Sequence, residues 1–292
     1  MLWRMRAALP DRPGALAALA QECGKAGVNI VGLQIFPGVD RVTDELVLSA
    51  PDDWTETDLR ELVERSGGES VVAAVCTEVA LVDQPTRYVQ AARAILTEPA
   101  SFPDVVAHLF DADVDAGDDV MELTVGDVQV QVRREAPFTA VEHARGAAMA
   151  ELVSDVLRRE MPQLASASGR MGQGMVPEYA VTGTTVTALI DDQVVGAATV
   201  RPSSVDEPDS RTVDLQVDGA WRRRGIGTRL LTEAARFARS DGAGEIMLTA
   251  GADNQAVLPM VLSAGLRARI RMAGDVLTVR ITVTPSRRRS TG

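Results

Sequence analysis

A basic loop containing two glycines stands between a strand pattern and a helix pattern near the C-terminal end of the sequence. The apolar run ending at Val217 is followed by three arginines and by Gly225-Ile226-Gly227, and a helical pattern over residues 228–238 comes next. Glycine lets the backbone approach an anion closely, and the N–H groups at a helix start favour a phosphate group. Arginine side chains add positive charge for such a group. The loop therefore predicts a pyrophosphate site.

Two kinds of fold place a pyrophosphate on such a loop. A dinucleotide-binding fold fits poorly, because Gly225 and Gly227 lack the third glycine of that motif and no acidic residue ends a second parallel strand about 20 residues on. The loop instead resembles the pyrophosphate loop of the GNAT superfamily, which is Gln or Arg, two residues, Gly, one residue, then Gly or Ala. Arg222, Gly225 and Gly227 match that pattern. The resemblance implies an acetyltransferase that uses acetyl-CoA.

The resemblance extends to the segments on both sides of the loop. Leu215-Gln216-Val217 stands where the family's fourth strand splays so that its backbone can pair with pantetheine. A strand pattern over 245–249 and Asp253-Asn254 before the next helix also match. The residues that the resemblance assigns to acetyl-CoA are Leu215, Gln216, Val217, Arg222, Arg223, Arg224, Gly225, Ile226, Gly227, Thr228 and Asn254.

The catalytic groups are less well marked than the coenzyme loop. Direct attack by an amine requires a group that takes the amine proton. Many GNAT members carry a glutamate for this early on the fourth strand, but Arg211 and Thr212 stand near that place here. Asp214 on the same strand is the nearest substitute, and Glu207 or Asp209 on the preceding loop could reach in. The alternative is that Asp214 is a surface aspartate on a strand.

A second departure from the family is the missing tyrosine that many relatives use to protonate the leaving thiolate. Met260 and Val261 occupy its neighbourhood. Either solvent protonates the thiolate, or the enzyme is slow, or activity has been lost. Three functions therefore stay open: a protein lysine acetyltransferase, a small-molecule amine or amino-acid N-acetyltransferase, and a non-catalytic sensor of acetyl-CoA and an amino acid.

The first 80 residues alternate between strand and helix patterns. Thr55 followed three residues later by Asp58 is a helix capping signature, and Gly67-Gly68 ends that helix. The order predicts a ferredoxin-like βαββαβ unit. The predicted strands are residues 3–9, 28–36, 41–50 and 71–79, and the predicted helices are residues 14–26 and 55–66.

Two short motifs make this N-terminal unit resemble the ACT family. They are Asp11-Arg12-Pro13-Gly14-Ala15-Leu16 at the first strand-to-helix turn and Gly27-Val28-Asn29-Ile30 at the second strand. The resemblance implies side-by-side pairing and an amino acid bound between that turn and a neighbouring second strand. The helix start near Gly14 would offer N–H groups to its α-carboxylate. The alternative is that Asp11 caps the helix and Asn29 completes a turn. The expected effector site is Asp11, Arg12, Pro13, Gly14, Ala15, Leu16, Asn29 and Ile30.

The patterns between these two ends predict the remaining organisation. Helices are expected at 88–96, 102–110 and 139–159, a hairpin at 120–133, a loop at 164–178, and strands at 186–190 and 194–200 in a mixed sheet. The fold class is therefore mixed α/β (α+β). The predicted domains are an ACT domain at 1–80, a helical connector at 81–118, a GNAT domain at 119–285 and a flexible tail at 286–292.

Composition limits the partners. The formal net charge is −11, which disfavours nucleic acid and favours a partner presenting lysine. The sequence shows neither an apolar run long enough for a membrane span nor a signal peptide, so we expect a cytoplasmic protein. Two cysteines and two histidines form no zinc spacing, so no metal is expected. The ACT and GNAT pairing resembles actinobacterial amino-acid-regulated protein lysine acetyltransferases, which implies a homodimer and acyl-CoA synthetases as targets.

Overall fold

The chain folds into two compact units. The computed structural model describes residues 1–37, 41–76, 84–112, 119–168, 176–203, 207–273 and 275–283. The first unit is Met1–Ala91, Ala116–Val120 and Arg134–Gly146, and the second is Ala92–Asp115, Met121–Arg133 and Ala147–Gly292. The predicted connector, residues 81–118, is thus divided between the two units.

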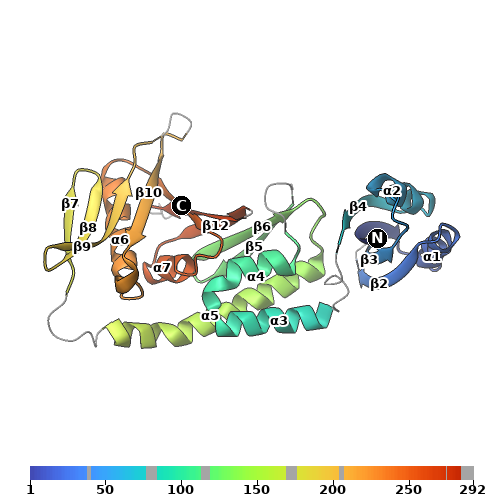
Figure 1. Ribbon diagram of the computed structural model, residues 1–292, viewed down its shortest axis with the longest axis horizontal. Coiled ribbons are helices and arrows are strands. Elements are labelled where there is room, and N and C mark those ends of the chain that lie inside the picture. The colour runs from blue at the N-terminus through green and yellow to red at the C-terminus, as the bar shows by residue number, and fades with distance from the viewer. Residues whose placement is uncertain are drawn as a thin grey trace, which may run out of the picture. The chain divides into compact units, whose positions relative to one another are not determined.

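A four-stranded antiparallel sheet forms the centre of the first unit, in the order β2-β3-β1-β4 (Figure 1). The order along the chain is the βαββαβ order predicted from the sequence, so this prediction is confirmed. The elements are β1 Leu2–Pro10, α1 Ala15–Lys25, β2 Asn29–Phe36, β3 Arg41–Ser49, α2 Glu56–Arg65 and β4 Glu69–Val75.

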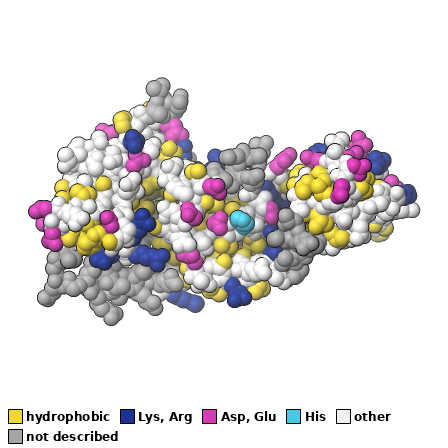
Figure 2. Space-filling view, viewed as in Figure 1, with side chains coloured by type: hydrophobic (Ala, Val, Ile, Leu, Met, Phe, Trp, Pro, Cys, Tyr) yellow, Lys and Arg dark blue, Asp and Glu magenta, His cyan; other side chains and the backbone are white. Residues whose placement is uncertain are grey.

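One face of this sheet carries the core of the unit. Side chains alternate along β1, so that Met5 and Leu9 are buried with Leu19 of α1 and Leu62 of α2. Each fully buried leucine contributes roughly 1.5–3 kcal/mol to folding. The edge strand β2 leaves apolar side chains at the surface: Leu33 and Ile35 are 45% and 51% exposed. Hydrophobic side chains gather on the visible surface of this unit in Figure 2.

The helix α2 begins as its sequence predicts. Thr55 Oγ1 accepts a hydrogen bond from the N–H of Asp58 at 3.4 Å, and Asp58 Oδ2 accepts one from the N–H of Thr55 at 2.8 Å. This reciprocal capping box satisfies two N–H groups that the helix itself leaves unpaired. The start of α2 is therefore closed by its own side chains.

A nine-stranded mixed sheet runs through the second unit in the order β5-β6-β12-β13-β11-β10-β9-β8-β7. The predicted strand pair 120–133 is part of this sheet, because β6 pairs with β12 in parallel. The strands are β5 Asp119–Val125, β6 Val128–Arg134, β7 Glu178–Thr182, β8 Thr185–Ile190, β9 Gln193–Val200, β10 Ser210–Val217, β11 Glu245–Gly251, β12 Ala268–Ala273 and β13 Val276–Thr282. The helices are α3 Gln84–Thr97, the 3-10 turn η2 Pro99–Ser101, α4 Phe102–Leu109, α5 Ala140–Ser168, the 3-10 turn η3 Gly219–Trp221, α6 Ile226–Ser240 and α7 Val257–Ser263.

The two faces of this sheet differ in polarity. The helix α4 packs against β12, and α6 packs against β8, β9, β10 and β11. Along β12, Ile270 and Met272 are buried, whereas Arg269 and Arg271 between and beyond them are exposed. Successive residues of a strand point to opposite faces. The apolar face is therefore covered by helices, and the polar face carries the arginines.

The structure corrects the predicted loop at 164–178. The helix α5 continues to Ser168, and β7 begins at Glu178. The extra helical residues include Leu164 and Ala165, whose helix propensity is high. The strand β7 is short and largely exposed. Because neither of its faces is buried, it does not need the apolar alternation from which a strand is predicted.

Parts of several predictions lie outside the described residues. These are the end of the predicted strand 71–79, most of the acidic stretch 111–119, and the tail 286–292. Among the helices of the described part, none is long and apolar enough to cross a membrane.

Candidate functional site

The strands β10 and β11 separate partway along their length. They pair in parallel from Ser210 opposite Glu245 to Thr212 opposite Met247, and their pairing stops there. The strand β10 continues to Val217 while paired only with β9, and β11 continues to Gly251 while paired with β13. The sheet therefore opens into a splayed gap beyond Thr212 and Met247.

The backbone edge of β10 that faces this gap is set by the alternation of the strand. Thr212 C=O accepts from Arg201 N–H at 2.8 Å, and Asp218 N–H donates to Val195 C=O at 2.9 Å, so the even-numbered residues bond toward β9. The N–H and C=O groups of Leu215 and Val217 consequently face the gap. Those of Gln216 face β9, although all three were predicted to contact the coenzyme.

The helix α6 begins at the mouth of the gap without a side-chain cap. Gly225 precedes it with φ of 80°, a left-handed conformation that favours glycine, and the first turn contains no acidic residue. Among the described residues, nothing accepts a hydrogen bond from the N–H groups of Ile226, Gly227 or Thr228. This helix start is therefore an open set of donors with a positive dipole end.

The glycine loop and the splayed strand lie against each other. A Cβ on Gly227 would lie 3.7 Å from Val217 Cγ2, 3.9 Å from Leu215 Cδ2 and 3.2 Å from Met260 Sδ. Only glycine leaves this space open without a shift of the sulfur atom. Loop, strand and helix α7 thus meet at one place.

The three arginines of the loop are all exposed, and each is placed differently. Arg222 Nε donates to Val217 C=O at 3.2 Å, and the Arg224 guanidinium lies 4.6 Å from the centre of the Trp221 ring. Arg223 has a positive φ of 60°, which is uncommon for a residue with a side chain. The loop therefore concentrates positive charge beside the open donors of α6.

Asp214 lies on the polar face of β10, just past the point where the strands separate. Its Oδ2 atom accepts a hydrogen bond from Arg201 Nε at 2.5 Å, and both side chains are about half exposed. Its neighbour across the strand pair is Thr199. Sequence patterns gave no signal for Arg201, because the pairing depends on the register of β9 and β10.

The other two candidate carboxylates are engaged elsewhere. Glu207 Oε1 lies 2.5 Å from an Arg280 nitrogen on β13. Asp209 Oδ1 accepts the N–H of Gly244 at 2.9 Å, which fixes the chain before β11. Of the three carboxylates, Asp214 is the one placed on β10 beside the gap.

Asn254 is located in the turn between β11 and α7. Its side-chain oxygen accepts the N–H of Ala256 at 3.2 Å, and its own N–H donates to Gly251 C=O at 2.9 Å. The residue lines a hollow of about 460 Å³ together with Ser101 and Asp104 of the η2 and α4 region. Asn254 therefore shapes the turn that ends the splayed strand.

The predicted effector site of the first unit also centres on an uncapped helix start. Gly14 precedes α1 with φ of 90°, and no side chain caps the helix, so Asp11 is not its cap. Ala15 N–H donates to Arg12 C=O at 3.3 Å, whereas the N–H groups of Leu16 and Ala17 have no acceptor among the described residues. The residues from Asp11 to Gly14 are exposed.

Asn29 and Ile30, the other predicted effector residues, form the start of β2. Asn29 is exposed and lies opposite Ser49 of β3. Asn29 is thus part of a strand rather than a turn. It lies at the open edge of the sheet, because β2 is an outer strand.

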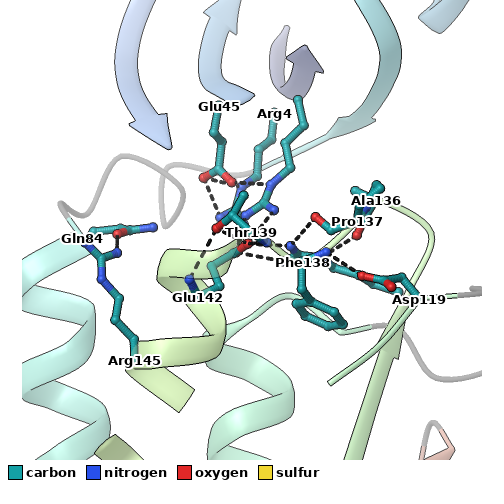
Figure 3. A network of polar contacts seen from close by, with 12 residues as sticks. Arg4, Glu45, Gln84, Asp119, Ala136, Pro137, Phe138, Thr139, Glu142 and Arg145 are labelled. Carbon is teal, nitrogen blue, oxygen red and sulfur yellow. Dashed lines mark hydrogen bonds and ion pairs between the residues drawn. The ribbon is translucent and has the colours of Figure 1, made fainter. Parts of the chain in front are cut away.

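A buried network of arginines and glutamates in the first unit was not predicted from the sequence (Figure 3). Glu45 of β3 accepts from Arg4 at 2.7 Å and from Arg6 at 2.6 Å. Glu142 of α5 accepts from Arg6 and from Arg134, each at 2.7 Å. Breaking a buried ion pair by removing one partner costs about 3–5 kcal/mol. The network therefore holds the start of α5 to the sheet of the first unit.

Glu142 also caps its own helix. Its Oε2 atom accepts the N–H of Thr139 at 2.9 Å, and its N–H donates to Thr139 Oγ1 at 3.2 Å. Burial alone would raise the pKa of Glu142, but hydrogen bonds from Arg134 and Arg6 outweigh burial and hold the pKa at about 2. The Thr139-to-Glu142 spacing is a capping signature that could have located this helix start.

The comparison with protein families identifies the splayed region. Residues 159–265 match the model of the Acetyltransferase (GNAT) family. The chain therefore contains a GNAT acetyltransferase domain, and acetyltransferases of this family use acetyl-CoA. No curated protein matches the sequence significantly.

Solved structures of several acetyltransferases are similar to parts of this chain. The GNAT domain of PAT from S. lividans is 17% identical, with a TM-score of 0.31, over 34% of this chain and 59% of that domain. Diaminobutyrate acetyltransferase EctA from Paenibacillus lautus is 18% identical, with a TM-score of 0.30, over 36% of this chain and 73% of the enzyme. Ribosomal-protein-alanine N-acetyltransferase from Brucella melitensis is 20% identical, with a TM-score of 0.29, over 42% and 77%.

Proposed function

We propose that this chain transfers the acetyl group of acetyl-CoA to the ε-amino group of a protein lysine, and that an amino acid bound at the start of α1 regulates the rate. The observation that carries the proposal is the meeting of the splayed strands with the uncapped start of α6. The GNAT domain matched at residues 159–265 supports the acetyltransferase class.

The free donors at the start of α6 suit the pyrophosphate of the coenzyme. The N–H groups of Ile226, Gly227 and Thr228 have no acceptor in the described part of the chain, and Arg222 to Arg224 lie beside them. Oriented N–H groups at a helix start bind phosphate oxygens, and nearby arginines neutralise their charge. The N–H and C=O groups of Leu215 and the N–H of Val217 would pair with the pantetheine amides, since Val217 C=O already accepts from Arg222.

Asp214 is the base that we propose for the amine proton. When bound, acetyl-CoA supplies a thioester whose carbon the amine attacks, and the carbon–sulfur bond breaks as the thiolate leaves. Asp214 lies on β10 beside the gap, where it would accept the proton that the amine loses. Arg201 orients its carboxylate. Met260 stands near Gly227 and has no proton to donate, so water protonates the thiolate.

The effector role rests on the first unit. The free N–H groups of Leu16 and Ala17 and the side chain of Arg12 suit an α-carboxylate. The apolar side chains of Leu33 and Ile35, exposed on the edge strand β2, suit a second copy of the chain. We therefore propose a homodimer in which β2 of one chain lies beside the α1 start of its partner.

Acetyl transfer to a lysine-containing peptide, measured by mass spectrometry with and without each of the twenty amino acids, tests this function. An acyl-CoA synthetase is the first protein acceptor to assay, as the sequence resemblance suggests. We expect acetylation of lysine that one amino acid changes severalfold. Acetylation of free amines but of no peptide or protein lysine would favour a small-molecule N-acetyltransferase.

A sensor without catalysis is a second candidate function. It is favoured by the engagement of all three candidate carboxylates, with Asp214 on Arg201, Glu207 on Arg280 and Asp209 on the backbone of Gly244. Single-turnover transfer by Asp214→Asn separates the two functions. The enzyme hypothesis predicts a loss of about 100-fold with unchanged acetyl-CoA affinity, as is typical of a general base. An unchanged rate would mean that Asp214 is not the base.

A further inference from the structure

Three exposed arginines lie on the polar face of β12 and directly before it. Arg267, Arg269 and Arg271 occupy alternate positions, and all three are exposed. Among the residues that the structure describes, none of them has an ion-pair or hydrogen-bond partner for its side chain. Ala268 and Ile270 lie between them and are buried on the opposite face. These three residues, called the arginine ladder below, are therefore charges that the fold itself does not use.

The neighbouring strands leave this positive charge unneutralised. Arg269 lies opposite Gln129 on one side and Arg280 on the other. Arg280 already contacts two carboxylates, Glu207 at 2.5 Å and Glu245 at 2.9 Å. Two carboxylates lie near the ladder, Asp127 and Glu245, and Glu245 is already paired with Arg280. The chain as a whole carries a net charge of −11. The ladder is thus a basic stripe on an acidic protein.

A hollow adjoins the ladder on the same face. It has a volume of about 380 Å³, and its charged lining residues are Arg267, Arg269, Arg280, Asp127 and Glu245. An anionic ligand on this face would meet the guanidinium groups of Arg267 and Arg269, which have no ion-pair partner among the described residues.

We propose that the arginine ladder is a docking surface for an extended, acidic segment of the acceptor protein, next to the lysine that is acetylated. This inference rests on the proposed acetyl transfer to a protein. Alternate residues of a strand are about 6.7 Å apart, and alternate side chains of an extended peptide have the same spacing. Glutamate or aspartate at every second position would therefore match the three guanidinium groups one by one.

The register of the sheet connects the ladder to the splayed gap. Arg269 lies opposite Arg280, Arg280 opposite Met247, and Met247 opposite Thr212, where β10 and β11 separate. Residues paired across neighbouring strands point to the same face of the sheet. Asp214, two residues after Thr212 on β10, points to that face as well. A segment docked on the ladder thus lies on the same side of the sheet as the proposed base.

A peptide fits this face better than a nucleic acid does. Proteins that bind single strands stack the bases on aromatic side chains. Two rows of paired residues cross this face in the described part of the chain, and neither contains an aromatic residue. The first row is Gln129, Arg269, Arg280, Met247 and Thr212, and the second is Gln131, Arg271, Thr278 and Thr249. The net charge of −11 also repels a polyanion of many phosphates, whereas a short acidic segment meets mainly the local charge.

The test is a binding titration of the full chain without acetyl-CoA. The probe is a fluorescein-labelled peptide that alternates glutamate with threonine and contains one lysine, and its anisotropy reports binding. We expect Arg267→Ser/Arg269→Ser/Arg271→Ser to weaken binding about tenfold or more, since three partly exposed charge pairs are lost. A peptide with glutamine in place of glutamate should not bind measurably.

The matched control removes three exposed arginines from helices, Arg60→Ser/Arg65→Ser/Arg93→Ser, and changes the net charge equally. It should bind the acidic peptide as the unchanged chain does. Equal weakening by both triple variants, absence of binding by the unchanged chain, or tighter binding of an oligothymidylate than of the peptide would overturn the docking surface.

A separate kinetic measurement distinguishes this inference from the proposed function. Acetyl transfer to the same peptide should show a raised KM and an unchanged kcat in the ladder variant. Binding through the ladder without any acetylation would leave the docking surface standing and refute the transfer. Acetylation with the same KM in the unchanged chain and in the ladder variant would support the acetyl transfer and refute the docking surface.

Discussion

The starts of α1 and α6 use the same backbone device in two different units. Each helix follows a glycine in the left-handed conformation, Gly14 at φ of 90° and Gly225 at φ of 80°. Neither has a side-chain cap or an acidic residue in its first turn. They differ in charge, because one arginine, Arg12, precedes α1 and three precede α6. The difference suits a single carboxylate at the first and a pyrophosphate at the second.

The helices α2 and α5 show the contrasting arrangement. Thr55 with Asp58 and Thr139 with Glu142 form reciprocal hydrogen bonds that occupy the first N–H groups. A capped start has fewer free donors for a ligand, whereas an uncapped start leaves its first N–H groups to water or to a ligand. The helices α4 and α7 also lack a side-chain cap, but no left-handed glycine precedes them, so a left-handed glycine together with an uncapped start distinguishes the two proposed binding sites.

The largest effect is expected for Gly225→Glu. A side chain at φ of 80° strains the loop, and a carboxylate occupies the proposed phosphate position, so acetyl-CoA affinity should fall about 1,000-fold, or about 4 kcal/mol. Calorimetric titration measures this. Amino-acid binding by the same variant is the control and should not change. A Kd for acetyl-CoA within threefold of that of the unchanged chain would show that the coenzyme does not bind at this helix start.

Glu142→Gln tests the claim that a capped start is structural. The change leaves Arg6 and Arg134 without their carboxylate, and should destabilise the first unit by about 3 kcal/mol at pH 7 in chemical denaturation. Since the folded-state pKa of about 2 lies below the ordinary 4.5, this stabilisation is present above pH 4.5 and is lost as the pH falls toward 2. Acetyl-CoA affinity should be unaffected. A difference in stability that stays constant from pH 7 to pH 2 would argue against ionised Glu142 as the cause.

Gly14→Glu is expected to have a smaller effect than Gly225→Glu. The site at α1 offers two free N–H groups and one arginine, so the amino-acid affinity should fall about 30-fold, or about 2 kcal/mol. Titration of the amino acid that binds the unchanged chain is the measurement. Loss of acetyl-CoA binding in this variant would show that the two helix starts do not act as separate sites.

Thr55→Ala should have the smallest effect. Losing one member of a capping box destabilises a protein by about 1 kcal/mol. Thermal unfolding should show a drop of a few degrees, and both ligands should bind as before. An altered affinity for either ligand would mean that a capped helix start also takes part in binding.

The sequence predicted those parts of the fold that depend on local patterns. The capping signature at Thr55 and Asp58 and the glycine loop around Gly225 are short motifs whose geometry is set by neighbouring residues. The strand β7 and the continuation of α5 to Ser168 were missed, because an exposed edge strand carries little alternation and the glycines, serines and proline of residues 164–178 are typical of a loop. Local patterns therefore located the helix starts better than the extent of the elements.

The partners of charged groups could not be predicted, because they come from segments far apart in the chain. Arg6 and Glu142 meet only after the first sheet and α5 have formed, and Arg201 reaches Asp214 only through the register of β9 and β10. The alternation of arginines from Arg267 to Arg271 was visible in the sequence. Its meaning depended on knowing which face of β12 is covered.

Calorimetric titration of acetyl-CoA in the absence and presence of a saturating amino acid, and of the amino acid in the absence and presence of acetyl-CoA, tests the central claim most directly. We predict that both ligands bind the same chain together. Each should change the affinity for the other by the same factor, as linkage between two sites requires. Mutually exclusive binding, or binding of acetyl-CoA alone with no response to any of the twenty amino acids, would contradict a transferase regulated from a second site.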